Sequence, residues 1–301
     1  MINIILGAVS LGLLWAIMTT GVFLTYRVLD YADLSVEGSI VMGAAIVAKL
    51  ITGGVNPIIA TVCAFAGGLA AGVVTGLLNT KLKIPSLLAG ILTMIALYSV
   101  NIRIMGKANI TLLKSETVFT MVETIGLKGN TGVIIVAVVI NAAIAAALYW
   151  FFGTELGCAV RATGDNRKMA RAQGINTDTM KILALALSNG LVALSGALIA
   201  QDQSYADVSM GQGAIVIGLA SVIIGEVIFY RGNFLNRLIS VVLGAVVYRI
   251  IIALVIEMGM KPTDLKLFTA ITVAICLALP TFQPQIKAKL AKILPQKKEV
   301  K

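Results

Sequence analysis

Long apolar runs separated by short polar segments dominate the chain. A helix that crosses the hydrocarbon core of a bilayer needs about 20 residues, and somewhat fewer where the helix is interrupted. Nine runs meet this length, and they cover Ile4–Tyr26, Val36–Ile51, Pro57–Leu78, Pro85–Ile102, Gly132–Phe152, Ile182–Ala200, Gly213–Phe229, Leu235–Ile256 and Leu267–Leu279. The pattern predicts an all-α fold, a single polytopic transmembrane domain over residues 1–301 with about nine helices.

The longest charged segment between two apolar runs is Gly153–Lys181. Asp165 and Asn166 are good N-cap residues, the following RKMARAQ favours a helix, and Gly174 stands where a C′ glycine would end it. Asn176 and the two residues after it offer a cap for the next helix. A helix of two turns is too short to persist alone and too polar to enter a bilayer, so we expect it to rest on a partner surface.

Eight positions of this segment form a motif: Ala162, Gly164, Asn166, Ala170, Arg171, Gly174, Ile175 and Asn176. In its spacing the motif resembles the cytoplasmic coupling-helix loop of permease subunits of ABC importers, of the branched-chain amino acid and ribose type. The resemblance implies a surface that couples the permease to its ATPase, formed by Gly164, Asp165, Asn166, Ala170, Arg171 and Gly174. A solvated basic loop is the alternative, but it does not account for a helix with a cap at one end and a glycine at the other.

The composition is that of an integral membrane protein, because 58% of the residues are hydrophobic, 13% are charged and the mean hydropathy is +0.96. The chain has no histidine, which removes the commonest general base and metal ligand, and Cys63, Cys158 and Cys276 have no paired spacing. It also lacks a GxxxxGK[ST] phosphate loop. We expect no enzyme activity, metal or cofactor in this chain, and ATP hydrolysis on a separate subunit.

Lysine and arginine residues set the expected orientation in the cell membrane. If Gly153–Lys181 is cytoplasmic, the parity of the runs places the N-terminus outside and the C-terminus, with the basic tail 282–301, inside. Inner segments then hold 16 of the 24 Lys and Arg residues, which agrees with the positive-inside rule. The net charge of +10 therefore reflects topology, and we expect no nucleic-acid binding.

A polar run, DYADLSVEGSIVMG, follows the first apolar run at its predicted inner end. Asp33 and Ser35 can cap the second helix, and the dipole of that helix favours Glu37 in its first turn. The run resembles the DLSVGS element of ribose-type permeases with Glu37 inserted. The form DLSVEGS is similar to a branch of the family whose partners bind aromatic amino acids.

A second D-x-S run, DVSMGQG, carries Asp207 and Ser209 between two later apolar runs. Five runs separate equivalent positions, so the two halves of the chain would have opposite orientations. This is the pattern of an inverted repeat, whose broken helices often line the transport pathway. Coincidence in a sequence of low complexity is the alternative.

Arg249 is the one basic residue well inside an apolar run. A charge there needs a partner or a watery cavity. It either snorkels or pairs with Glu257 or a backbone carbonyl, or it attracts the carboxylate of a substrate in the pathway. The tentative pathway residues are Asp33, Ser35, Glu37, Asp207, Ser209 and Arg249.

The resemblance implies a permease subunit that works with two copies of an ATP-binding subunit and an extracellular or periplasmic substrate-binding protein, and that forms a homodimer in the lipid bilayer. The outer segment Arg103–Asn130, of mixed charge, offers the binding protein a docking surface. The expected substrate is an amino acid, aromatic before branched-chain, with a monosaccharide as the alternative. An ion-coupled secondary transporter is a second alternative; such coupling usually places acidic groups inside the spans, where Glu226 is the only candidate.

Overall fold

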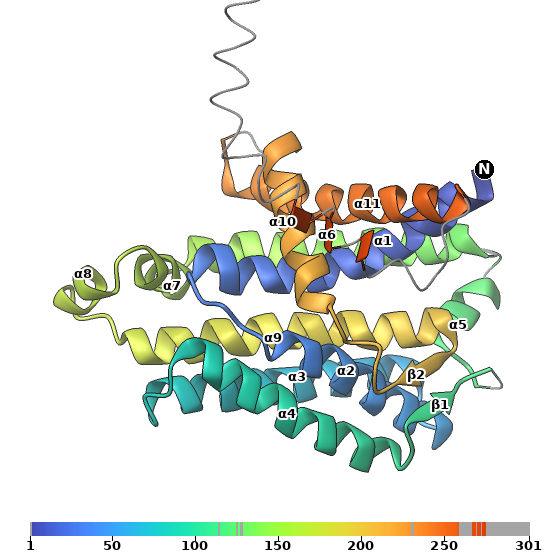
Figure 1. Cartoon of the computed structure of the whole chain (residues 1–301), viewed down its shortest axis with the longest axis horizontal. Helices are drawn as coiled ribbons and strands as arrows, with labels where there is room; N and C mark the ends of the chain where they lie inside the picture. Colours follow the sequence, from blue (N-terminus) through green and yellow to red (C-terminus); the bar gives the residue numbers. More distant parts are fainter. Residues whose placement is uncertain are drawn as a thin grey trace, which may run out of the picture.

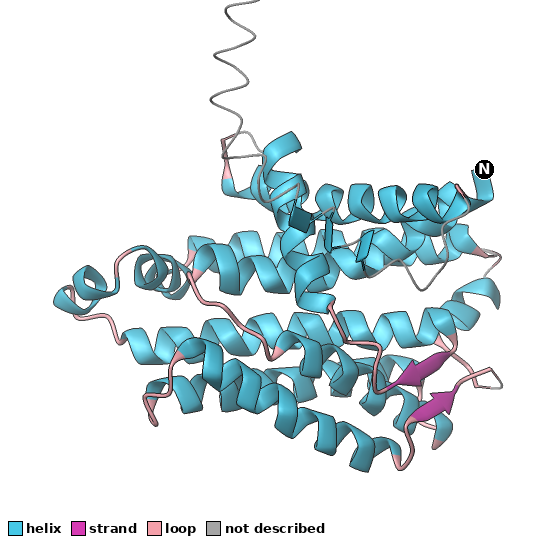
Figure 2. Ribbon diagram, viewed as in Figure 1, coloured by secondary structure: helices cyan, strands magenta, loops and turns pink. Residues whose placement is uncertain are grey.

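A computed structural model describes residues 2–113, 115–124, 126, 129–229 and 232–258, and positions 267, 268, 270, 271, 273 and 274. Within this part the chain is a bundle of long helices with one two-stranded ribbon (Figures 1 and 2). The ninth predicted run, Leu267–Leu279, lies largely outside the described residues, and the predicted basic tail 282–301 lies wholly outside them.

The helices and strands follow one another along the chain as α1 (Ile2–Phe23), the π-helical turn η1 (Leu24–Val28), α2 (Val36–Thr52), α3 (Pro57–Thr80), α4 (Ser86–Met105), β1 (Asn109–Thr111), α5 (Val118–Thr124), α6 (Asn130–Gly153), α7 (Glu155–Asp165), α8 (Arg167–Ala172), α9 (Thr177–Gln203), β2 (Tyr205–Asp207), α10 (Ala214–Phe229) and α11 (Phe234–Glu257).

The first eight predicted runs are all helical. Six helices of the described chain are long and apolar enough to cross a membrane: α1 continued by η1, α3, α4, α6, α9 and α11. The other two predicted spans are shorter helices, since α2 has 17 residues and α10 has 16. The fold is thus a helical membrane bundle. The antiparallel ribbon of β1 and β2, in which Ile110 faces Ala206, is the departure from an all-α chain.

α9 is the central helix of the bundle. It is the most deeply buried of the long helices, and α1, α2 and α3 all pack against it. Glycines make this close packing possible. A Cβ added at Gly43 of α2 would overlap the Ala193 carbonyl, and one at Gly72 of α3 would overlap the Leu185 carbonyl. Small residues that let two backbones touch are the usual contact between helices in a membrane.

The chain between η1 and α2 enters the bundle as a non-helical segment. Val28, at the end of η1, lies against Gly164 of α7. Asp33 then accepts a hydrogen bond from Asn189 Nδ2 (2.8 Å), near the middle of α9. α2 therefore begins halfway along the bundle. The predicted position of Asp33 and Ser35 at the inner boundary is wrong, since both side chains are buried beside α9.

The segment after α9 also turns back into the bundle. β2, which follows α9 directly, pairs with β1. Asn109 Nδ2 of β1 also donates to Asp207 Oδ2 of β2 (3.1 Å). The chain then reverses, so that Gly211 lies against the Glu37 carbonyl at the start of α2, and Gly218 of α10 lies against α1. α10, like α2, begins inside the bundle after a non-helical segment.

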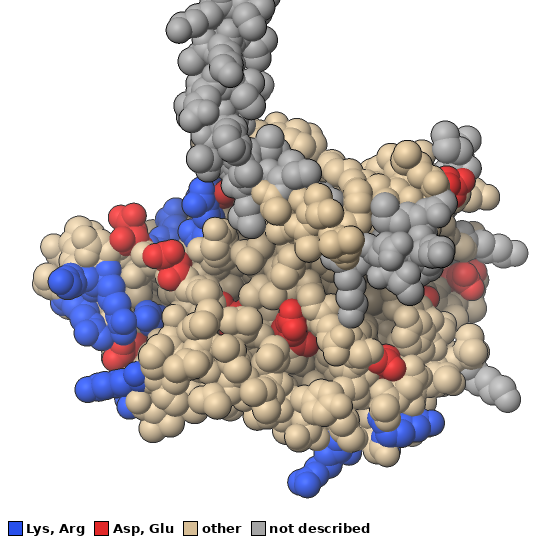
Figure 3. All heavy atoms as spheres, viewed as in Figure 1, with Lys and Arg blue, Asp and Glu red and all other residues tan. Residues whose placement is uncertain are grey.

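The two ends of the bundle carry different structures. The N-terminus, α5 and the β-ribbon lie at one end, whereas α7 and α8 extend from the other (Figure 1). On the face shown in Figure 3, Lys and Arg side chains gather around the α8 end. The basic segment and the N-terminus are thus on opposite ends of the molecule.

The packing of α2 on α9 predicts the effect of one added methyl group. In Gly43→Ala the new Cβ would overlap the Ala193 backbone, so we expect a loss of about 1–3 kcal/mol in stability despite the better helix propensity of alanine. The measurement is the thermal unfolding midpoint of the purified protein. Gly153→Ala is the control, because no heavy atom lies within 4 Å of its Cβ position. Equal midpoints for the two variants would contradict the packing argument.

Candidate functional site

The loop between α6 and α9 contains two short helices where the sequence indicates one. α7 begins after Thr154, whose Oγ1 accepts from the Gly157 N–H (3.3 Å), and ends at Asp165. Asn166 caps α8, because its Oδ1 accepts from the Met169 N–H (3.0 Å). The Asn166 cap agrees with the sequence prediction. α7 is not apparent from the apolar pattern, although Thr154 followed by an acidic residue is a signal for a helix start.

α8 ends in a turn that depends on Gly174. The backbone there is left-handed, with a φ of +81°. The Gly174 N–H donates to the Arg171 carbonyl and the Ile175 N–H to the Ala170 carbonyl, each at 3.0 Å, which are the two hydrogen bonds of a Schellman motif. No heavy atom lies within 4 Å of a Cβ at Gly174. Glycine is therefore required here by the backbone conformation and not by space, and the predicted glycine stop is confirmed.

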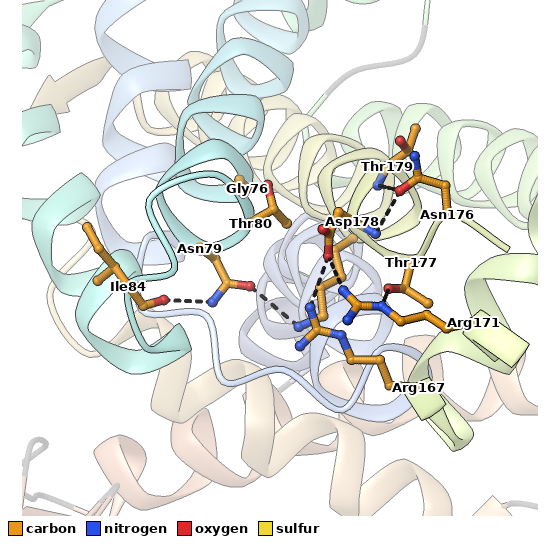
Figure 4. Close-up of polar contacts among 11 residues, drawn as sticks. Gly76, Asn79, Thr80, Ile84, Arg167, Arg171, Asn176, Thr177, Asp178 and Thr179 are labelled. Atoms are coloured by element: carbon orange, nitrogen blue, oxygen red, sulfur yellow. Dashed lines mark hydrogen bonds and ion pairs between the residues drawn. The ribbon is translucent and has the colours of Figure 1, made fainter. Parts of the chain in front are cut away.

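Ion pairs hold α8 against the first turn of α9 (Figure 4). Arg167 and Arg171 both donate to Asp178 Oδ1, at 3.0 and 2.9 Å, and Arg171 Nε also donates to Thr177 Oγ1 (2.8 Å). Asn176 caps α9, as predicted. Because the charged groups are partly exposed, each pair contributes on the order of 1 kcal/mol or less. Their effect is to fix the direction in which α8 points.

The outward face of α8 is both basic and apolar. Lys168 and Met169 are exposed, whereas Ala170 faces the protein and is buried. Behind α8, Gly164 lies so close to the chain at the end of η1 that a Cβ would overlap the Val28 carbonyl. The predicted coupling residues are thus gathered on α7, α8 and the turns beside them, and α7 rests directly on the segment that leads to α2.

A groove beside α8 extends this basic surface. It has a volume of about 680 Å³ and lies between α8, the start of α9 and the turn that joins α3 to α4. Lys181 Nζ donates to Asn79 Oδ1 across it (3.4 Å). Its basic lining residues are Lys83, Arg167, Lys168, Arg171 and Lys181, and its acidic ones are Asp30 and Asp178.

A buried polar network joins the non-helical segment before α2 to α9. Asp33 Oδ2 accepts from Asn189 Nδ2 (2.8 Å), and Asp33 Oδ1 accepts from the Ser35 N–H (2.9 Å) and hydroxyl (2.5 Å). Ser39 Oγ donates to Asn189 Oδ1 (2.6 Å). A carboxylate buried in a helical bundle is tolerated when such donors surround it. The network fixes where α2 begins.

The two D-x-S runs form the same local turn. Asp207 Oδ1 accepts from the Ser209 N–H (2.7 Å) and from the Ser209 hydroxyl, as Asp33 does from Ser35. The hydrogen bond from the Ser209 hydroxyl holds the pKa of Asp207 below its ordinary value. Ser35 occupies the N-cap position of α2 without a side-chain cap bond, so the predicted capping by its hydroxyl is wrong. The first turn is buried, whereas the second lies at the exposed end of the bundle.

A cavity of about 400 Å³ lies where α2 begins. Its lining residues come from α2, α4 and the turn before α10, and they are Glu37, Gly38, Val41, Met94, Ile95, Tyr98, Asn101, Val208, Gly211 and Gln212. Of the predicted pathway residues, only Glu37 is in this lining. Glu37 Oε1 accepts from the Gly213 N–H (3.0 Å), which ties the start of α2 to the start of α10. The apolar pattern does not single out Asn101, although it is a polar residue inside an apolar run.

Arg249 lies away from this cavity lining, between α11 and α1. Its guanidinium carbon is 4.2 Å from the centre of the Trp15 ring, a cation–π contact; the residue is half-buried and its Nε atom is buried. In the described chain Arg249 makes no ion pair with Glu257. Whether Arg249 acts in transport stays a prediction.

Glu226 is held by two arginines at the end of α10. Arg27 Nε and Arg237 Nη2 donate to Glu226 Oε1, at 3.0 and 2.7 Å. The three residues join η1, α10 and α11. A carboxylate with two cationic partners is a structural clamp, which does not favour the ion-coupling role considered from the sequence.

The described residues include no group of three or more histidine, cysteine, aspartate or glutamate side chains that could hold a metal ion. Cys63 and Cys158 are free and exposed, and Cys276 lies outside the described residues.

Comparisons with known proteins extend over nearly the whole chain. Residues 4–278 match the family described as "Branched-chain amino acid transport system / permease component". The tyrosine transport system permease protein of Clostridioides difficile is 41% identical over 98% of this chain and 99% of its own length. The ribose import permease protein RbsC of Escherichia coli K12 is 26% identical over 81% of this chain and 74% of its own length. No solved structure matches.

The buried network predicts a strong dependence on Asn189. Asn189→Leu leaves the Asp33 carboxylate without its amide donor, and we expect a loss of about 3–5 kcal/mol in stability, seen as a collapse of the monodisperse fraction in size-exclusion chromatography. The exchange Asp33→Asn with Asn189→Asp keeps one carboxylate and one amide, so we expect it to recover part of that fraction. Asn189→Leu with a wild-type elution profile would contradict the role given to the network.

Proposed function

Because this chain belongs to the family of permease components of branched-chain amino acid transport systems, we propose that it is the membrane subunit of an ATP-driven importer for aromatic amino acids. The observation that carries the proposal is the α7–α8 loop. It is a capped, ion-paired helix that ends in a Schellman turn and projects from one end of the bundle. A short helix held this rigidly, with an exposed basic and apolar face, suits docking to another protein.

A separate ATPase binds this loop in the proposed assembly. The chain has no phosphate-binding loop of its own, so ATP hydrolysis belongs to another subunit. The proposed assembly is a permease homodimer with two ATPase copies. Each ATPase contacts the α8 helix of one permease. The groove of about 680 Å³ beside α8 adds basic side chains to the docking surface. On the opposite end, α5 and the β-ribbon form the surface offered to an external substrate-binding protein.

The proposed topology has nine spans, with the N-terminus outside and the C-terminus inside. The positions of the N-terminus and of the basic α8 end at opposite ends of the bundle support it, because basic segments stay cytoplasmic. An inverted repeat is part of the proposal. Two features support it. First, α2 and α10 both begin inside the bundle after a D-x-S turn. Second, α2 follows α1, which runs inward in this topology, whereas α10 follows α9, which runs outward.

The substrate assignment rests on the relatives and on the cavity. The tyrosine permease of Clostridioides difficile matches almost the full chain, whereas the ribose permease of Escherichia coli is less similar. The cavity walls are largely apolar and include Tyr98 and Met94, which suit an aromatic side chain better than a sugar. Glu37 also distinguishes this chain from the DLSVGS form of ribose-type permeases.

Reconstitution tests the proposal. The permease, its ATPase and its binding protein are placed in proteoliposomes, and the ATP-dependent uptake of labelled tyrosine, leucine and ribose is compared. We expect uptake of tyrosine in preference to leucine and no uptake of ribose. ATP-dependent ribose uptake, or uptake that needs a sodium or proton gradient and no ATP, contradicts the proposal.

The coupling role of the loop is tested at Gly174. Valine in a left-handed conformation costs about 1–2 kcal/mol, so Gly174→Val should disturb the end of α8 without affecting membrane insertion. We expect a severalfold fall in tyrosine uptake and in ATP hydrolysis stimulated by the binding protein. Gly153→Val is the matched control, since Gly153 is exposed at the same end with open space and an ordinary φ. Full transport by Gly174→Val would rule out the role given to this turn.

A further inference from the structure

The cavity at the start of α2 has one polar side and several apolar walls. Val41 of α2 and Met94, Ile95 and Tyr98 of α4 supply apolar surface. The polar side is formed by groups from all three parts of the lining: Glu37 from α2, Asn101 from α4 and Gln212 from the turn before α10. With a volume of about 400 Å³ it is within the range of sites for small molecules.

Asn101, a residue of the cavity lining, has an unused hydrogen-bond acceptor. Its side chain is 1% exposed, and its Nδ2 donates to the Gly38 carbonyl (3.1 Å). A carbonyl can only accept, so this bond fixes which amide atom is nitrogen and which is oxygen. The buried Oδ1 then has no donor within the described part of the chain. A buried acceptor without a donor is costly, and a ligand that supplies an N–H would remove that cost.

Glu37 is a second acceptor in the lining of the same cavity. It precedes Gly38, the residue to which Asn101 is bonded, and its carboxylate accepts from the backbone N–H groups of Gly213, at 3.0 Å, and Ile215. A carboxylate has two oxygens and about four acceptor positions. Among the described residues that line the cavity there is no Lys or Arg, and Glu37 is in none of the described ion pairs. The charge is supported by the first turn of α2 but has no cationic partner there.

We propose that Glu37 and Asn101 form a transient binding site for the ammonium group of the substrate, with the aromatic part of the substrate against Met94 and Tyr98. An ammonium group brings three N–H donors and one positive charge, which match two acceptors and one unpaired carboxylate. A substrate carboxylate alone would be repelled by Glu37, and a neutral sugar would leave the charge without a partner. The identity of the substrate in this inference rests on the proposed function. The preference of the cavity for an aromatic amine is independent of that function.

The test measures protection of a reporter cysteine in the cavity. In the full-length permease in lipid nanodiscs, the three native cysteines are changed to serine and Met94→Cys is introduced. The rate of maleimide alkylation is measured with tyramine, which has the ammonium group without a carboxylate, and with 3-(4-hydroxyphenyl)propionate, which has the carboxylate without the ammonium group. Both are used at equal concentration and ionic strength.

We expect tyramine to slow alkylation and the propionate to have little effect. Glu37→Gln keeps one oxygen for the Gly213 N–H, but it removes the charge and replaces the other oxygen with an NH2 group, so it should weaken protection by tyramine about tenfold while the protein stays folded. Asn101→Leu removes the other acceptor and should weaken protection severalfold. A second variant, which keeps Cys63 on α3 and has Met94 and the two other cysteine-to-serine changes, controls for direct effects of tyramine on the reagent, and its alkylation should be unaffected.

Equal protection by the two compounds, protection by neither, or protection unchanged in Glu37→Gln would overturn the proposal. Protection by sodium chloride alone at the same ionic strength would also overturn it, because the site would then be one for an inorganic cation. Failure of the reconstituted transporter to take up tyrosine, with protection by tyramine intact, would instead overturn the proposed function and leave the ammonium site standing.

Discussion

The hydrogen bonds of one side-chain amide, that of Asn189, determine how the centre of this bundle is built. The amide lies on α9 and bonds Asp33, Ser35 and Ser39, all from the segment that opens α2. Without these bonds a carboxylate and two hydroxyls would be buried with too few partners, at a cost of about 1–3 kcal/mol for each neutral group and more for the charge. With them, α2 can begin in the interior. The cavity exists because a helix starts there.

The same region connects the interior to the α7–α8 end. Gly164 of α7 touches the backbone at Val28, and only a few residues separate that contact from Asp33. A close backbone contact at Val28 and a buried side-chain hydrogen bond at Asp33 leave this segment little room for independent movement. A displacement of α7 would therefore be passed to the start of α2, and from there through Glu37 to Gly213 at the start of α10. The α7–α8 surface proposed for coupling and the cavity are therefore separated by a short, packed segment of the chain.

The sequence predicts most of the helices and the local chemistry of their ends. The apolar run Ile182–Ala200 lies within α9, and the caps at Asn166 and Asn176 and the glycine stop at Gly174 are all present, because they depend on neighbouring residues alone. The depth of Asp33 and the cavity at Glu37 depend on contacts between distant segments, which periodicity does not record. The β-ribbon escapes prediction because three-residue strands carry too short a pattern.

The distance along the chain between Asp33 and Asn189, 156 residues, has a consequence for biosynthesis. As the ribosome delivers the chain to the translocon, α2 emerges long before the helix that supplies its main polar partner. A helix of 17 residues that opens beside an unpartnered carboxylate is a poor candidate for stable insertion by itself. α2 therefore reaches its final depth only after α9 has entered the bilayer. Until then, we expect the Asp33 carboxylate to stay at the interface with water, because burying it in lipid hydrocarbon without a partner is costly.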